Sequence, residues 1–112
     1  MYFHVRRGEL GQWTVVHVVG EIDLATAPEF RRELIAAASS ATALAVDLTD
    51  CDLIDSVGLG ITLGAARRVR DGGGQFAVVA NDRARRAFVR CRLDEILDIV
   101  SDPADLAQGA RP

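Results

Sequence analysis

The chain has 112 residues, 49% of them hydrophobic and 26% charged, which fits one globular domain and is too short for a complete dinucleotide-binding enzyme or a barrel. Thirteen basic against sixteen acidic residues give a net charge of −3, which argues against non-specific binding to nucleic acid, so we expect protein partners. The sequence has no apolar run long enough to cross a membrane and no signal peptide at its start, so we expect a cytoplasmic protein.

The first half of the chain predicts a hairpin, a helix and a buried strand. Apolar and polar residues alternate over residues 2–7 and 13–22, which predicts two strands joined by a turn at residues 8–11. Over residues 24–40 the period changes to that of a helix, and Thr26-Ala27-Pro28-Glu29 predicts a capping box with proline in the first turn. The continuous apolar run over residues 43–48 is typical of a strand buried on both faces of a parallel sheet.

The second half predicts helices that alternate with strands. Residues 49–56 are polar enough to predict a loop, and a helix follows over residues 57–70, ended by the glycines at 72–74. Residues 75–80 predict another buried strand, residues 95–100 a weak edge strand, and Pro103 opens a short C-terminal helix that frays by Gly109. Between those strands, Asn81 or Asp82 caps a third helix, whose predicted apolar face consists of Ala84, Ala87, Phe88 and Cys91.

The predicted elements follow the order β-β-α-β-α-β-α-β-α, which places the chain in the α/β class, with a mixed, mostly parallel β-sheet packed with α-helices. In such sheets the carboxyl ends of the parallel strands form the working edge. The turn Gly20-Glu21-Ile22-Asp23 ends the second strand, and the Asp55-Ser56 loop follows the third. If these two strands are parallel neighbours, Asp23 and Ser56 lie at the same edge.

Residues 54–64 carry the strongest indication of function. Three glycines in the predicted helix, Gly58, Gly60 and Gly64, each cost about 1 kcal/mol relative to alanine, so contacts must compensate for them. One interpretation is close packing on the sheet, with Asp55 or Ser56 as the N-cap. A dinucleotide site does not fit, because the acidic loop before Gly58 would repel a pyrophosphate. A serine hydrolase does not fit either, because Ser56 lacks the Gly-x-Ser-x-Gly elbow.

The remaining reactive side chains predict no metal site and no cofactor. Cys51 and Cys91 lie far apart without zinc-ligand spacing, and we expect both to be small buried hydrophobic residues. A redox role for Cys51 would require a lowered thiol pKa. His4 and His17 could face each other across the hairpin, but no third ligand accompanies them. The polar face of the third helix is basic, and we predict that it is a solvated surface and not a nucleic-acid site. Its arginines are Arg83, Arg85, Arg86, Arg90 and Arg92.

Several of these motifs together resemble a known family. The motifs are Gly20-Glu21-Ile22-Asp23 with Thr26-Ala27-Pro28, Asp47-Leu48, Ile54-Asp55-Ser56-x-Gly58-Leu59-Gly60, and the Gly72-Gly73-Gly74 turn. They are similar to those of the anti-sigma factor antagonists, which are single-domain members of the STAS superfamily. The resemblance runs from about Val15 to Val100 and implies a single STAS domain over residues 1–112, with a core at about residues 2–108.

The resemblance implies a regulator of bacterial partner switching that has no catalytic activity of its own. In this scheme the unphosphorylated protein binds an anti-sigma factor that is also a serine kinase and so releases a sigma factor. Phosphorylation of Ser56 breaks the complex, and a serine phosphatase restores it. The residues implied at the partner-binding surface are Asp23, Asp55, Ser56, Val57, Gly58, Leu59, Gly60 and Thr62.

Several points stay open at this stage. A non-phosphorylated STAS scaffold that recruits other regulators is one alternative, and a small-ligand-binding or enzymatic α/β domain is another. Asp23 has an alternative role, which is to orient the turn before the first helix. We expect the free protein to be a monomer.

Overall fold

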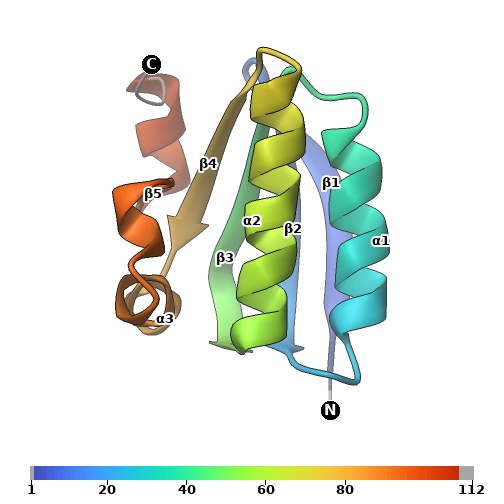
Figure 1. Ribbon diagram of the computed structural model, residues 1–112, viewed down its shortest axis with the longest axis vertical. Coiled ribbons are helices and arrows are strands. Elements are labelled where there is room, and N and C mark those ends of the chain that lie inside the picture. The colour runs from blue at the N-terminus through green and yellow to red at the C-terminus, as the bar shows by residue number, and fades with distance from the viewer. Residues whose placement is uncertain (1, 109–112) are drawn as a thin grey trace.

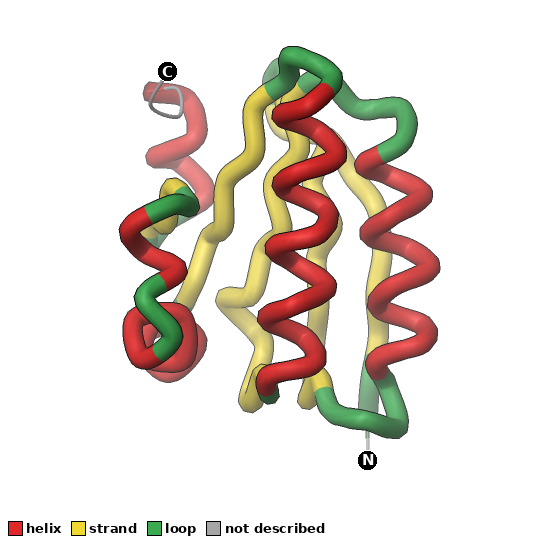
Figure 2. The backbone as a smooth tube through the Cα atoms, viewed as in Figure 1, coloured by secondary structure: helices red, strands yellow, loops and turns green. Residues whose placement is uncertain are grey.

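Five strands form one sheet, and α1 and α2 lie side by side over one of its faces (Figures 1 and 2). The computed structural model describes residues 2–108, and within them no helix is long and apolar enough to cross a membrane. The strands are β1 (His4–Leu10), β2 (Trp13–Ile22), β3 (Ala43–Ile54), β4 (Gln75–Ala80) and β5 (Asp98–Val100). The helices are α1 (Ala27–Ala38), α2 (Ser56–Asp71) and α3 (Asp82–Arg90), with two 3₁₀ helices, η1 (Leu93–Glu95) and η2 (Pro103–Gln108).

The sheet is mixed and mostly parallel, as predicted. Its strand order is β1-β2-β3-β4-β5, in which β1 and β2 are antiparallel and every other neighbouring pair is parallel. The crossovers between parallel neighbours run through α1, α2 and α3. The carboxyl ends of β2, β3 and β4 therefore meet at one edge of the sheet, drawn at the bottom of Figure 1.

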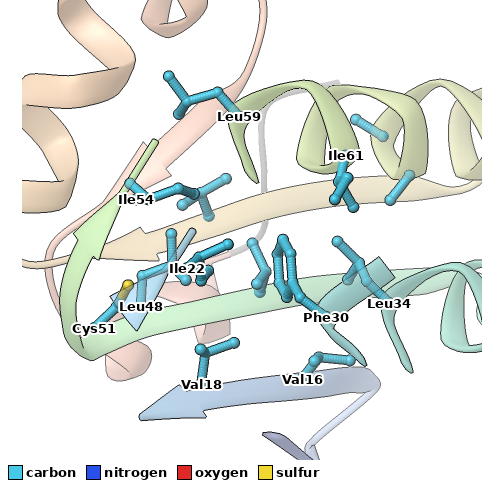
Figure 3. Packing of buried hydrophobic residues seen from close by; sticks show 14 of the residues in the cluster. Val16, Val18, Ile22, Phe30, Leu34, Leu48, Cys51, Ile54, Leu59 and Ile61 are labelled. Carbon is cyan, nitrogen blue, oxygen red and sulfur yellow. The ribbon is translucent and has the colours of Figure 1, made fainter. Parts of the chain in front are cut away.

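The main hydrophobic core lies between the sheet and the two helices α1 and α2. The predicted apolar face of α1 is buried, including Phe30 and Leu34, and it packs against the side chains that β2 and β3 direct to this face. The labelled residues in Figure 3 are Val16, Val18, Ile22, Phe30, Leu34, Leu48, Cys51, Ile54, Leu59 and Ile61.

A smaller cluster lies on the opposite face of the sheet, which we call the back face. There Trp13 packs with Leu106 of η2 and with alanine and valine side chains of β3 and β4. The Trp13 indole Nε1 donates a hydrogen bond to the Leu106 carbonyl at 3.0 Å. This contact holds η2 against the sheet.

The third strand is longer than predicted, and the predicted loop over residues 49–56 is wrong. β3 continues to Ile54, and its second half pairs with β2 through two register shifts. The shifts direct Cys51 and Ile54 into the core while Asp50 and Asp52 face solvent. Polar composition is typical of a loop, but here the pairing with β2 keeps the segment extended.

The capping box predicted at the start of the first helix is absent. Thr26 has a helical backbone (φ −99°, ψ −15°), and its side chain caps no helix amide. The Thr26 hydroxyl instead donates to the Glu21 carbonyl at 2.7 Å and accepts from the Asp23 amide at 2.9 Å. The hydroxyl therefore closes the turn between β2 and α1.

The third helix ends before the residue predicted to complete its apolar face. Ala84, Ala87 and Phe88 are buried as predicted, but α3 stops at Arg90, and Cys91 is exposed. The next residue, Arg92, adopts a left-handed conformation with φ +60° that turns the chain into η1.

The ends of the sheet also differ from the prediction. β1 runs to Leu10, because Gly11, with φ +59°, makes the hairpin turn. The register places His4 opposite Val19 and Arg6 opposite His17, so the two histidines do not face each other.

The C-terminal elements are shorter than predicted. β5 covers only Asp98–Val100, after η1, and the segment that begins at Pro103 is a 3₁₀ helix. The fraying predicted at Gly109 lies outside the described residues.

Candidate functional site

The ends of β2 and β3 bring Asp23, Asp55 and Ser56 to one edge of the sheet. Ile22 lies opposite Ile54 in the parallel register, and the Asp55 amide donates to the Ile22 carbonyl at 3.1 Å. Asp23 and Asp55 are therefore the residues that directly follow the ends of two adjacent strands, β2 and β3. This confirms the expectation that the segments after the second and third strands share an edge.

Asp55 is the N-cap of α2. Its backbone is extended (φ −92°, ψ −177°), and its Oδ1 accepts a hydrogen bond from the Gly58 amide at 3.1 Å. Its carbonyl accepts the first intrahelical bond, from the Leu59 amide at 3.0 Å. The side-chain bond satisfies the Gly58 amide, which a helix start otherwise leaves without a partner, and Ser56 is the first residue of α2.

The Ser56 side chain is exposed at this helix start. Its hydroxyl makes no hydrogen bond with any other described residue. The position is open to another protein, and the N-terminus of a helix favours negative charge. The hydroxyl of Ser56 is thus available to accept a phosphoryl group.

Asp23 closes the turn between β2 and α1. Its Oδ1 accepts hydrogen bonds from the Ala25 amide at 2.9 Å and the Thr26 amide at 3.2 Å, and it lies 3.3 Å from the Thr26 hydroxyl oxygen. Its backbone carbonyl accepts from the Ala27 amide at 2.8 Å. The turn-orienting role, left open by the sequence, is therefore present, while Oδ2 bonds to no described residue.

Three of the residues predicted to contact a partner are buried. A Cβ added to Gly58 would lie 2.7 Å from the side chains of both Ile22 and Ile54, and Leu59 is in the core. Thr62 is 0% exposed, and its hydroxyl donates to the Gly58 carbonyl at 2.9 Å. These three residues pack the first turns of α2 against the strand ends, and their contact with a partner stays a prediction.

The same edge exposes apolar side chains that the sequence analysis did not select. Leu24 is 77% exposed and Leu53 46%, and Val57, which was already predicted to contact the partner, is 40% exposed. Exposed apolar groups that gather at one place mark surfaces for protein binding. Leu24 and Leu53 each follow an aspartate and belong to no periodic apolar pattern that would have drawn attention to them. We call Asp23, Leu24, Leu53, Ser56, Val57 and Gly60 the edge surface.

Two of the three helix glycines have no packing role inside the molecule. Gly60 and Gly64 are exposed, and a Cβ added to either would meet nothing within 4 Å. Together with Val57 they follow the spacing of one helix face. This bare face of α2 begins at the edge surface and allows close approach of another backbone.

Asn81 ties the irregular end of β3 to α3. Its side-chain amide donates to the carbonyls of Leu48, Thr49 and Cys51 at 3.2, 3.1 and 2.9 Å. Its Oδ1 accepts from the Ala84 amide at 2.8 Å and caps α3. The sequence indicated the capping role but not the three bonds to β3.

Cys51 is unsuited to redox chemistry. Burial raises the pKa of its thiol from the ordinary 9.0 to about 11, and its Sγ donates to the Leu53 carbonyl at 3.2 Å. Because the thiolate is the reactive form, this thiol is inert near neutral pH. Its role is packing at the register shift of β3.

Comparisons with known proteins agree with this architecture. The family model described as the STAS domain matches residues 5–106. A Bacillus subtilis protein named anti-sigma-B factor antagonist is 34% identical over 85 residues, which are 75% of this chain and 78% of that protein. The crystal structure of an anti-sigma factor antagonist from Mycobacterium paratuberculosis has a TM-score of 0.89 at 28% identity, covering 99% of this chain and 96% of that one. The structure of SpoIIAA in its unphosphorylated form, at 16% identity, has the same fold, with a TM-score of 0.70 over 96% of this chain and 94% of that one.

Proposed function

Since the chain belongs to the STAS domain family and is similar to the anti-sigma factor antagonists, we propose that its unphosphorylated form binds an anti-sigma factor with serine kinase activity, and that phosphorylation of Ser56 breaks this complex. Binding of the anti-sigma factor releases a sigma factor, and a serine phosphatase returns the protein to its binding form. The chain acts as a binding module, without catalysis of its own, in the cytoplasm.

The observation that carries this proposal is the position of Ser56. The exposed hydroxyl of Ser56 has no partner among residues 2–108. Ser56 is the first residue of α2 and lies just after the end of β3, beside the end of β2. A kinase can reach such a hydroxyl without unfolding any part of the sheet. The other exposed serines, Ser39, Ser40 and Ser101, lie away from the strand ends that form the edge surface.

The edge surface supplies the features that a protein interface needs. Leu24, Leu53 and Val57 offer apolar area, and Gly60 offers a place of close backbone approach. The free Oδ2 of Asp23 is available to a basic side chain of the anti-sigma factor. Leu24 and Leu53 therefore join the residues expected to contact the partner.

Phosphorylation acts on this surface through charge. The phosphoryl group adds about −1.5 to −2 charges in the middle of the edge surface, where the start of α2 tolerates it. Asp23 and Asp55 add negative charge beside it. The bound partner would have to remove this charge from water, so binding is lost without a change of fold.

The experiment combines capture and mass measurement. Tagged wild-type protein is incubated with lysate of its source organism, with and without ATP, and the captured partner and the intact mass of the protein are determined. We expect capture of an anti-sigma factor without ATP, and with ATP the gain of one phosphoryl group together with loss of the partner.

Variants at position 56 separate the two halves of the proposal. Ser56→Ala should bind the partner permanently and gain no phosphate, whereas Ser101→Ala, the matched control at another exposed serine, should behave as wild type. Ser56→Asp should weaken binding at least about tenfold, equivalent to about 1.4 kcal/mol. Phosphate on a serine other than Ser56 contradicts the proposed switch, and binding without any phosphate favours the non-phosphorylated scaffold.

A further inference from the structure

The sequence analysis led us to expect a monomeric free protein; we propose instead that it forms a weak dimer at high concentration by antiparallel pairing of β1 with β1 of a second copy, with the two-fold axis at Gly8. β1 is an edge strand that pairs only with β2 among residues 2–108, so its outer side leaves backbone donors and acceptors unpaired. The other edge strand, β5, has only 3 residues. This inference goes beyond the proposed function, because it assigns a partner to a surface that contains no residue of the edge surface.

Gly8 has no structural role within one copy of the chain. Its φ is not positive, the register between β1 and β2 has no shift at this residue, and an added Cβ would meet nothing within 4 Å. Glycine inside a strand costs stability and otherwise marks a bulge or a close approach of another backbone. With the bulge absent, the close approach of a second chain accounts for this residue.

The charges beside Gly8 select the register of the pairing. Arg7 and Glu9 are exposed, and neither has a partner among the described residues. With the axis at Gly8, Arg7 of each copy lies opposite Glu9 of the other, so two ion pairs form by symmetry. An axis at Arg6, Arg7 or Glu9 would instead place like charges opposite each other.

The back face of the sheet is complementary in the same register. Leu10 is 44% exposed, and with the axis at Gly8 it lies opposite Arg6 of the second copy. The aliphatic part of that arginine would cover Leu10 while its charged end stays in water. Arg6, Gly8 and Leu10 also line an open cavity of about 320 Å³ on this face, which the second copy would border.

The dimer would be weak and would leave Ser56 free. Pairing of two short strands buries less area than a standard protein interface, so we expect a dissociation constant in the micromolar range, roughly 10 μM or weaker. β1 lies on the side of β2 away from β3, and the edge surface takes no part in the pairing. Each dimer therefore presents two sites for the anti-sigma factor.

Sedimentation equilibrium over a concentration range of roughly 1 to 500 μM tests the proposal. The mean mass of the wild-type protein should rise from 12.0 kDa towards twice that value. A mass that stays at 12.0 kDa throughout the range overturns the proposal.

Charge variants test the register. Arg7→Glu and Glu9→Arg should each weaken dimerisation at least about tenfold, because each places like charges opposite across the two-fold axis. An equimolar mixture of the two variants should recover the dimer, since every pair across the axis is then attractive. Arg31→Glu, which changes an exposed arginine of α1, is the matched control and should dimerise as wild type.

The variants also distinguish this interface from any other. Circular dichroism should show wild-type melting for all of them, because the substituted side chains are exposed and make no hydrogen bond or ion pair with described residues. Folded single variants that dimerise as tightly as wild type would place the interface elsewhere and overturn the proposal. These measurements involve no anti-sigma factor, so their outcome is independent of the proposed function.

Discussion

Asp23 shows that one side chain can serve the fold and a partner together. Its Oδ1 accepts hydrogen bonds from the Ala25 and Thr26 amides that close the turn before α1, and its Oδ2 bonds to no described residue. Removal of the whole carboxylate would therefore disturb both the turn and any ion pair with a partner. An amide at the same position would keep the acceptor oxygen and remove only the charge.

We therefore expect opposite results from two substitutions at this position. Asp23→Ala should lower the free energy of unfolding by about 1–2 kcal/mol, because the amides of Ala25 and Thr26 lose their acceptor. Asp23→Asn should melt close to wild type but bind the anti-sigma factor more weakly. Calorimetry and surface plasmon resonance on the same preparations decide this, and wild-type binding by a folded Asp23→Asn would return Asp23 to a purely structural role.

The raised pKa of the buried Cys51 thiol predicts that the folded protein loses stability at alkaline pH. Above pH 9.0 the thiol of the unfolded chain ionises, whereas burial keeps the folded thiol protonated up to about pH 11. The raised pKa therefore stabilises the folded state below pH 9.0, and this contribution declines as the pH rises towards 11. Urea unfolding of wild type and Cys51→Ala at several pH values should show a steeper decline for wild type. Parallel declines would mean that the Cys51 thiol ionises equally in both states.

At the scale of elements, α2 separates glycines that pack from glycines that face outward. Gly58 lies against Ile22 and Ile54, so it lets the first turn of the helix rest directly on the strand ends. Gly60 and Gly64 have open space around them and cost helix stability with no packing in return. The three glycines of α2 therefore differ in role: Gly58 is required for packing inside the molecule, whereas Gly60 and Gly64 are not.

Alanine substitutions should reveal this difference. Gly58→Ala should destabilise the protein by about 1–3 kcal/mol, because the new methyl group would overlap two buried side chains. Gly60→Ala should raise stability by up to about 1 kcal/mol, since nothing obstructs the methyl group. Thermal melts of the two variants against wild type measure both effects. Equal shifts for the pair would contradict the contrast drawn from their surroundings.

At the scale of the whole molecule, two hydrophobic clusters, one on each face of the sheet, stabilise the fold. The larger cluster joins the sheet to α1 and α2, and the smaller one holds η2 over the back face through Trp13 and Leu106. Trp13 is the single tryptophan of the chain, so its fluorescence reports directly on this second cluster.

Leu106→Ala should expose Trp13 and destabilise the fold. Removal of a buried leucine side chain costs about 2–5 kcal/mol, towards the lower end where a surface helix can shift into the space. We expect a red shift of the tryptophan emission in the folded protein and a lower denaturation midpoint. Asp105→Ala, an exposed neighbour on η2, should leave the emission unchanged. An unchanged emission for Leu106→Ala would mean that η2 does not shield Trp13 in solution.

Local patterns were sufficient for the order of elements and for the edge at which Asp23 and Ser56 meet. Periodicity distinguishes strands from helices within a few residues, and short crossovers leave few ways to arrange parallel strands. The Asp55 cap and the end of the second helix near the glycines at 72–74 are local too, because the groups that satisfy the helix amides are close in sequence.

Tertiary contacts decided the rest of the site. β3 stays extended to Ile54 because β2 supplies its hydrogen-bond partners, and no pattern within residues 49–56 contains that information. Thr62 is buried on the face of α2 that packs on the sheet, whereas Leu24 and Leu53 are exposed. The sequence by itself determined which residues reach the edge of the sheet, since the chain order of strands and helices decides that. Which of those side chains face a partner depends on packing between elements distant in sequence, and only the folded structure contains those contacts.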